Sequence, residues 1–246
     1  MKVVVSEKYA HLSEWMRKLP ARGICGEVLR DDRNTLWCER AEGEELVVKR
    51  FAKPLRLNRW VYTFFRPTKA KRSFVYSQRL ERLGIAVAEP VGYIECRQGL
   101  LFHTGYYVSK RLPYPTLGEL DREKPLRQLE ILDAFADFTV ELHEKGILDY
   151  DYNPGNIFYY PEAGTWRFAL IDVNRMAFRR RLSRRDCVEM LHHLDWDTPF
   201  LDYVLIRYAE RRKWDWKILS GAVLLKQGIN LPVRIRRFFK RLVGRM

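Results

Sequence analysis

The sequence predicts an α+β protein in which short strands come first and longer helices follow. Three strand-like runs separated by polar turns lie within residues 26–51. Leucine and phenylalanine recur every three or four residues across residues 126–145, which indicates a helix with one apolar face. Two apolar runs, residues 157–160 and 166–171, flank a turn and predict a hairpin. A chain of 246 residues is long enough to bury a sizeable core as a single domain.

The remaining elements of the first part follow in chain order. Residues 1–8 contain three consecutive valines and an early lysine, and they predict a first strand rather than a secretion signal. Residues 70–83 predict a helix that a glycine closes. Residues 85–94 and 105–112 predict two further strands.

Residues 53–71 are unusual because aromatic residues alternate with arginines and further basic residues follow. One interpretation is a surface that meets anionic lipid headgroups or a phosphorylated saccharide. The alternative is a loop whose aromatic side chains pack on the strands while its charges stay solvated. The sequence leaves both interpretations open.

The composition describes a globular and strongly basic protein. Apolar residues make up 47% of the chain, and no run approaches the roughly 18 apolar residues that span a bilayer. The four cysteines are scattered without a C-x-x-C pair, which predicts reduced thiols and a cytoplasmic protein. The formal net charge of +14 implies a polyanionic partner: nucleic acid, an anionic membrane surface or a phosphorylated glycolipid. Because no RNA or DNA motif is recognisable, we expect no nucleic acid among the partners.

The residues that carry chemistry are two aspartates and an asparagine. Asn156 follows Asp151 by five positions, and Asp172 lies 21 residues after Asp151. This pattern suits phosphoryl transfer, because one aspartate can orient an attacking hydroxyl while the other two residues hold Mg²⁺ against ATP phosphates. Taken alone, D-x-x-P-G-N is also a tight turn. Its place between a helix and a hairpin, with Asp172 at the end of the second strand, favours a metal site.

Two segments carry a resemblance to a known family. Residues 149–158 read D-Y-D-Y-N-P-G-N-I-F, and residues 171–175 read I-D-V-N-R. They resemble the catalytic loop and the metal motif of the kinase-like superfamily, in particular of the bacterial lipopolysaccharide kinases that phosphorylate inner-core sugars. The resemblance covers about residues 26–208 and is specific in its central part.

The resemblance implies a fold and its division along the chain. We expect a protein kinase-like two-lobed α+β fold that forms one domain over residues 1–246. A small β-rich N-lobe would comprise about residues 1–108, a hinge about residues 109–115, and a helical C-lobe about residues 116–232.

The resemblance also implies cofactors and roles. Val47-Val48-Lys49 is similar to the V-A-x-K segment in which kinases carry the lysine that binds ATP phosphates. Lys49 is therefore the predicted cofactor-binding residue and Asp151 the predicted catalytic base. Asn156 and Asp172 are the predicted Mg²⁺ ligands, so ATP and Mg²⁺ are the expected cofactors.

Three features depart from the family pattern. The chain has no G-x-G-x-x-G, and the corresponding hairpin tip reads D-D-R-N. The helix predicted at residues 70–83 has no acid near Val75 to pair with Lys49, so another acid would have to reach the lysine; the candidates are Glu44, Glu45 and Glu81. Asp149 replaces a histidine that is structural in most kinases, which predicts altered packing rather than lost chemistry.

Arginines crowd the stretch after the metal motif. Arg175, Arg179 and Arg180 are the predicted acceptor-binding residues, because guanidinium groups clamp phosphates and carboxylates bidentately. A solvated charge run is the alternative. Residues 186–191 predict the start of a helix, with Asp186 as its cap or as the partner of an arginine. The chain shows no A-P-E segment, which disfavours protein substrates.

The C-terminal residues 233–246 predict a basic amphipathic helix, because apolar and basic residues fall on opposite faces. We expect it to make peripheral contact with an anionic membrane; a helix that covers the core through the same apolar face is the alternative. His143 ends the helix predicted at residues 126–145 and is interpreted as a core or capping histidine.

The spacing therefore predicts phosphoryl transfer, and the resemblance together with the basic surface implies an ATP-dependent kinase that phosphorylates a Kdo or heptose hydroxyl of the lipopolysaccharide inner core. Its expected place is the cytoplasm, peripherally at the inner face of the cytoplasmic membrane, with the glycolipid as substrate. The alternative is a pseudokinase that serves as a membrane-docked binding module. A kinase of cationic antibiotics is disfavoured, because such enzymes use acidic pockets where this chain offers arginine. The oligomeric state leaves no trace in the sequence.

Overall fold

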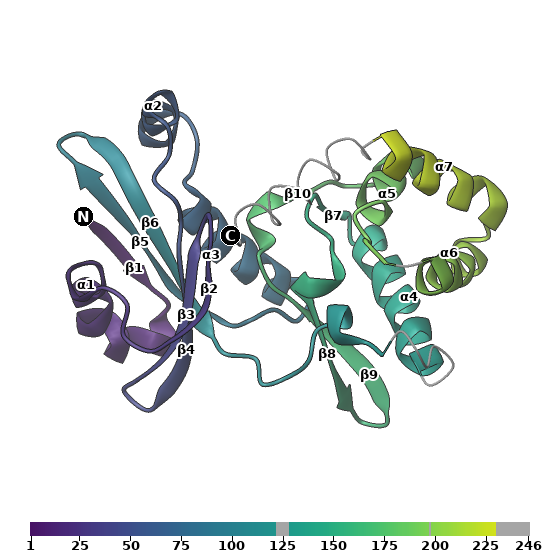
Figure 1. Cartoon of the computed structure of the whole chain (residues 1–246), viewed down its shortest axis with the longest axis horizontal. Coiled ribbons are helices and arrows are strands. Elements are labelled where there is room, and N and C mark those ends of the chain that lie inside the picture. The colour runs from purple at the N-terminus through teal and green to yellow at the C-terminus, as the bar shows by residue number, and fades with distance from the viewer. Residues whose placement is uncertain (122–127, 197, 230–246) are drawn as a thin grey trace, which may run out of the picture. The chain divides into compact units, whose positions relative to one another are not determined.

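The computed structural model describes residues 1–121, 128–196 and 198–229 (Figure 1). The chain divides into two compact units. The first comprises Met1–Pro113 together with Ala169–Asn174, and the second comprises Tyr114–Phe168 and the chain from Arg175 onward. The division after Pro113 falls among the residues predicted as a hinge.

The first unit is built on an antiparallel six-stranded sheet, in the order β1-β5-β6-β4-β3-β2 (Figure 1). The predicted first strand and three-strand run are confirmed, whereas the two later strands begin at different residues from those predicted. The strands are β1 (Lys2–Val5), β2 (Glu27–Asp31), β3 (Thr35–Ala41), β4 (Glu44–Arg50), β5 (Pro90–Gln98) and β6 (Leu101–Lys110).

Alternation along β4 directs its side chains to two different cores. Leu46 and Val48 are fully buried in a cluster with Met16 of α1 (Ser13–Arg22), which follows the short helix η1 (Glu7–Leu12). Phe51, two residues beyond Lys49, belongs to a second cluster, with Phe74 of α3 (Lys69–Arg82). Because side chains alternate along a strand, Lys49 lies on the α3 side of the sheet. The predicted helix at residues 70–83 is confirmed.

The segment predicted either as a lipid-facing surface or as a packed loop contains a helix, α2 (Arg56–Phe64). Two hydrogen bonds attach it to β6: Arg59 Nε donates to the Phe102 carbonyl at 2.8 Å, and the Phe102 N–H donates to Thr63 Oγ1 at 2.9 Å. Most of its large apolar side chains remain exposed, and in Figure 1 the helix projects from the sheet. The loop interpretation is therefore wrong.

The second unit is mainly helical. The predicted hairpin is confirmed, and the predicted long helix is described from Leu129, its first residues lying outside the described part. The elements of the second unit are η2 (Leu117–Glu119), α4 (Leu129–Glu144), β7 (Ile147–Asp149), η4 (Pro154–Asn156), β8 (Ile157–Glu162), β9 (Thr165–Leu170), η5 (Val173–Arg175), β10 (Met176–Phe178), α5 (Arg184–Leu191), α6 (Thr198–Arg212) and α7 (Trp216–Ile229). Two of these elements, β9 and η5, cross the boundary into the first unit.

The core of this unit forms where α4 meets α6. Leu132, Phe135 and Leu142 of α4 are fully buried, as is Tyr208 of α6. His143 is buried with them and hydrogen-bonds through Nδ1 to the Tyr208 hydroxyl at 2.8 Å, so its interpretation as a core histidine is confirmed. The predicted basic helix at residues 233–246 lies outside the described residues. No helix in the described part of the chain is both long and apolar enough to cross a membrane.

Candidate active site

The loop that carries Asp151 begins at a buried aspartate. β7 pairs antiparallel with β10, which places Asp149 opposite Met176 and lets the Tyr150 N–H donate to the Arg175 carbonyl at 3.2 Å. Asp149 is only 2% exposed, and its Oδ1 accepts the backbone N–H of Asp151 at 2.8 Å. The residue in place of the histidine of most kinases thus holds the first turn of the loop by a hydrogen bond to its side chain.

Asp151 and Asn156 lie together in the second unit. The Asp151 carbonyl accepts from Asn153 N at 2.8 Å, from Asn153 Nδ2 at 2.9 Å and from Asn156 Nδ2 at 3.0 Å. Because the amide nitrogen of Asn156 is used in this way, its oxygen Oδ1 is the end left to bind a ligand. The Asp151 carboxylate is about one-third exposed, and Oδ1 lies 3.6 Å from Arg175 Nη1. The backbone is fixed while the carboxylate stays accessible.

Two residues that the sequence pattern did not reveal anchor this loop to α4. Tyr152 is fully buried, its ring stacks on Phe135 with centroids 5.8 Å apart, and its hydroxyl lies 2.9 Å from that of Thr139. Burial raises the pKa of Tyr152, so the phenol stays protonated. The sequence signal for Tyr152 was only that an aromatic residue stands between two polar loop residues. Such a signal does not predict whether the side chain points into the core or into solvent.

Lys49 and Asp172 lie together in the first unit. Asp172 follows the end of β9, where Leu170 is fixed to the chain before β5: its N–H donates to Ala86 at 3.0 Å, and its carbonyl accepts from Ala88 at 3.2 Å. Lys49 is 9% exposed, and its Nζ lies 2.5 Å from Asp172 Oδ2. The other carboxylate oxygen of Asp172 accepts a hydrogen bond from Asn174 Nδ2.

The backbone at Asp172 is in the left-handed region, with φ of 56°. Non-glycine residues adopt this conformation rarely, and aspartate and asparagine tolerate it best. Such strain persists where the surrounding contacts enforce it, often at functional sites. Here the enforcing contacts are the Leu170 backbone bonds before it and the Asn174 amide after it.

The partner of Lys49 is thus Asp172 and none of the three glutamates considered from the sequence. Glu44 pairs with Lys110, and Glu45 pairs with Arg40 at 2.6 Å. In α3, Val75 stands near the position where kinases have the glutamate, and it is 38% exposed. Ser77 nearby is engaged with the buried Tyr107, whose hydroxyl lies 3.0 Å from its own.

The three predicted acceptor-binding arginines differ in their contacts. Arg175 faces Asp151. Arg179 pairs with Asp186 at 2.5 Å, and Asp186 also forms a capping box with Ser183 at the start of α5. Asp186 is therefore both a cap and an arginine partner. Arg180 is exposed. Within the described residues Arg175 contacts the loop through Asp151, and Arg179 contacts it through the Tyr150 hydroxyl at 3.5 Å while its main partner is Asp186 of α5.

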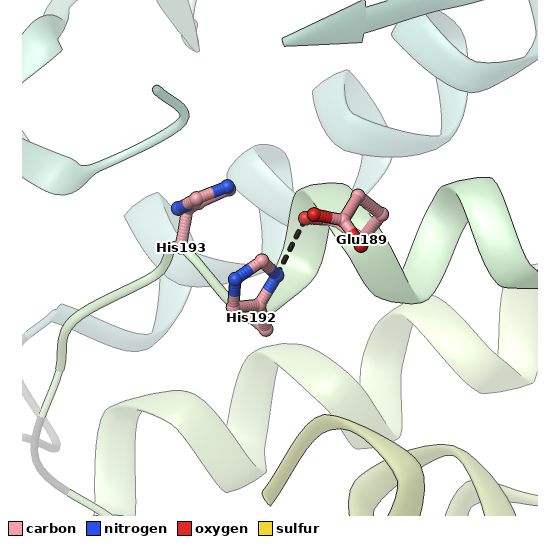
Figure 2. A group of neighbouring side chains, drawn as sticks. All are labelled: Glu189, His192 and His193. Carbon is pink, nitrogen blue, oxygen red and sulfur yellow. Dashed lines mark hydrogen bonds between the residues drawn. The ribbon is translucent and has the colours of Figure 1, made fainter. Parts of the chain in front are cut away.

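A second group of potential ligands lies at the end of α5. The side-chain ligand atoms of Glu189, His192 and His193 lie within 4.8 Å of one another (Figure 2). His192 Nδ1 donates to the Glu189 carbonyl at 2.6 Å, and Lys226 Nζ lies 2.7 Å from Glu189 Oε2. A lysine ammonium already neutralises the one carboxylate, so this group closes a helix end and does not favour a metal ion.

The comparisons with known proteins fit this geometry. The sequence model of the lipopolysaccharide kinase (Kdo/WaaP) family matches residues 26–202, well over half of the chain. The chain belongs to this family. The predicted family is thereby confirmed, and the protein is a kinase of lipopolysaccharide biosynthesis.

A solved structure is similar to this chain over more residues than the family model matches. The chain is similar to one described as WaaP in complex with acyl carrier protein, at a TM-score of 0.60 and 17% identity, over 94% of this chain and 98% of that chain. At that identity the likeness shows a shared fold, and it confirms the predicted kinase-like α+β class. A search of curated proteins gave no match.

Proposed function

We propose that this lipopolysaccharide kinase transfers the γ-phosphate of ATP to a hydroxyl of a Kdo or heptose residue of the inner core, at the cytoplasmic face of the membrane. The observation that carries the proposal is the Lys49–Asp172 ion pair of 2.5 Å. It brings together a lysine on the third strand of a three-strand run and the aspartate after the hairpin. These are the two positions that bind phosphates and metal in kinases.

Each residue has a role that its surroundings support. Asp151 would accept the hydrogen bond of the attacking sugar hydroxyl, because its carboxylate is accessible while its backbone is fixed at Asp149 and Asn156. Lys49 would bind phosphate oxygens of ATP. Since its ammonium is nearly buried, the interaction with phosphate would be little weakened by solvent.

Each of the two predicted ligands offers the kind of donor that Mg²⁺ uses. Asp172 offers a carboxylate, and Asn156 offers Oδ1 because its amide nitrogen is already used. Hard oxygen donors of this kind suit Mg²⁺, which prefers few protein ligands alongside phosphate oxygens. When bound, the ion would neutralise negative charge on the phosphates.

The acceptor and the partners follow from family and charge. The family implies a glycolipid substrate, and Arg175, exposed beside Asp151, would meet its anionic groups. The formal charge of +14 supports peripheral contact with an anionic membrane. Because the similar WaaP structure is a complex with acyl carrier protein, we also propose such a carrier as a partner.

The test is thermal unfolding with millimolar ATP, with and without Mg²⁺, on wild type, Asp172→Ala and Glu14→Ala. Glu14 is a matched control, because it is an exposed acid of the same unit that pairs with a lysine, Lys18. We expect magnesium-dependent stabilisation in wild type and Glu14→Ala and its loss in Asp172→Ala. Absence of any ATP-dependent shift in the wild type would contradict the proposal and favour the pseudokinase alternative.

A further inference from the structure

A long stretch of the first unit carries positive charge alone. Residues 46–80 contain ten lysines and arginines and no aspartate or glutamate, so they supply +10 of the formal +14. The stretch includes all of α2 and most of β4 and α3. A basic run of this length is not balanced by acids within it, so acids elsewhere, solvent counterions or an anionic ligand must meet its charge.

A pocket opens within this stretch, where α2, the start of α3 and the sheet meet. It has a volume of about 270 Å³. Three cationic residues, Arg33, Lys53 and Lys69, and three aromatic residues, Phe51, Tyr62 and Phe102, are among those that line it. None of the lining residues is acidic. Within the described part of the chain, none of the three cations forms a salt bridge or a side-chain hydrogen bond.

The position of Lys69 shows that this positive charge is poorly compensated. Lys69 lies in the first turn of α3, which holds basic residues and no acid although a helix start favours negative charge. Burial lowers the pKa of the Lys69 ammonium, and the nearby charges of Arg33 and Arg72 lower it further. Asp172 acts in the opposite direction, so the pocket lies within electrostatic reach of the Lys49–Asp172 pair. An anion in the pocket would relieve the mutual repulsion of these cations.

The outer face of α2 gives the pocket an apolar rim. Leu57 is 77% exposed and Phe65 is 84% exposed, and Trp60 and Phe64 are more than half exposed. Because Arg59 and Thr63 bind α2 to β6, these side chains are held outward. Exposed leucine and aromatic residues beside a basic face are typical of segments that enter the interface of an anionic membrane.

We propose that the pocket of Arg33, Lys53 and Lys69 binds a phosphate or carboxylate group of an anionic amphiphile, while the outer face of α2 rests in the lipid interface. Within the proposed function, on which this assignment rests, the amphiphile is the glycolipid acceptor. The pocket then favours a lipid-anchored anionic acceptor over a neutral sugar, and it repels cationic ones.

The test compares pocket variants with a matched variant outside the pocket. Lys53→Gln and Lys69→Gln, singly and together, remove charges that line it, whereas Lys71→Gln removes the same charge from the same turn of α3 outside the lining. Phe65→Ser tests the apolar rim and disturbs no core, since the ring is exposed. Each full-length protein is sedimented with vesicles of phosphatidylcholine alone, with added phosphatidylglycerol, or with added Kdo-bearing lipid A.

We expect the affinity of each pocket variant for anionic vesicles to fall by roughly tenfold or more, as for the loss of a charge-assisted contact. Lys71→Gln should lose about fivefold or less, as for a basic residue that is only near the surface. A loss confined to lipid A vesicles assigns the pocket to the acceptor, and a loss shared with phosphatidylglycerol assigns it to anionic lipid headgroups. Equal losses in Lys69→Gln and Lys71→Gln would overturn the proposal.

Two further measurements separate this inference from the proposed function. The pocket variants should keep the stabilisation by ATP and Mg²⁺; its loss in Lys69→Gln would instead assign the pocket to ATP phosphates and overturn the inference. If the wild type shows no ATP response while the pocket variants still lose vesicle binding, the proposed function fails and the anionic site stands. Binding of purified acyl carrier protein that the pocket variants lose, with vesicle binding unchanged, would overturn the membrane assignment.

Discussion

Asp151 combines a fixed backbone with an accessible carboxylate. Its N–H is held by the buried Asp149, and its carbonyl receives the amides of Asn153 and Asn156. The same amide nitrogen of Asn156 that binds the Asp151 carbonyl leaves the Asn156 oxygen Oδ1 for a ligand. One hydrogen bond thereby orients the proposed base and the proposed metal ligand together.

The change Asp151→Asn keeps the size of the side chain and removes the group that accepts a proton. We expect kcat to fall by roughly 10²–10⁴-fold, the usual contribution of a positioned base. Stabilisation by ATP and Mg²⁺ should remain, since the proposed contacts of the nucleotide are Lys49 and Asp172. The measurement is phosphate transfer to lipid A or core acceptors together with the thermal shift, with Glu141→Gln, a partly exposed acid paired with Lys145, as control. Unchanged turnover in Asp151→Asn would remove this residue from the mechanism.

Residue spacing was enough to identify Asp151, Asn156 and Asp172 as candidates, because the chemistry needs those residue types in that order, and the resemblance to kinases added Lys49. It could not identify the partner of Lys49. That pair joins strand β4 to a turn 123 positions later, and its geometry depends on the left-handed backbone at Asp172. The supports from Asp149, Tyr152 and Thr139 were also hidden, because their roles depend on burial and not on sequence pattern.

At the scale of elements, the pairing of β7 with β10 fixes where the catalytic loop begins. Gly146 precedes β7 with φ of 71°, and its carbonyl accepts the Arg179 N–H at 2.8 Å. A Cβ at this position would lie 1.8 Å from the Arg179 carbonyl oxygen. Gly164, in the turn between β8 and β9, has φ of 78°, and a Cβ there would meet no atom within 4 Å.

These two glycines separate backbone strain from steric conflict. Gly164→Ala should cost about 1 kcal/mol, the penalty of a left-handed conformation alone. Gly146→Ala should cost on the order of 3 kcal/mol or more, because the strand pair must also shift. Chemical unfolding of both variants and the wild type measures the difference. Equal costs would show that the contact between Gly146 and Arg179 can relax freely.

The elements themselves were predictable where periodicity is strong, as in α4 and in the β8–β9 hairpin. Elements were not predictable where contacts with distant parts of the chain determine whether they form. α2 exists with an exposed apolar face because Arg59 and Thr63 bind β6, and nothing local signals those bonds. Likewise η1 and α1 were not predicted; they are short, and Pro20 lies within α1.

At the scale of the whole molecule, the buried His143 and the partly buried His193 link stability to pH. Burial lowers the pKa of His143 to about 3 and that of His193 to about 4, with Arg212 and His192 lowering them further. Both imidazoles are therefore neutral in the folded protein. Protonated His143 would have to donate from both nitrogens, and the group facing its Nε2 is the weakly accepting sulfur of Met190 at 3.1 Å.

In the unfolded chain these histidines take up protons near their ordinary pKa of about 6.5. Between that pH and the lowered values the unfolded state binds more protons than the folded state, so the free energy of unfolding falls as the solution is acidified. Each histidine contributes a slope of at most about 1.4 kcal/mol per pH unit.

Urea unfolding of wild type, His143→Gln and the double variant with His193→Gln, from pH 7.5 down to 5, tests this dependence of stability on pH. The values at pH 7.5 record the structural cost of each substitution, and the slopes record titration alone. We expect the wild type to lose most stability on acidification and the double variant least, and parallel slopes would show that these histidines do not set the acid limit of the fold.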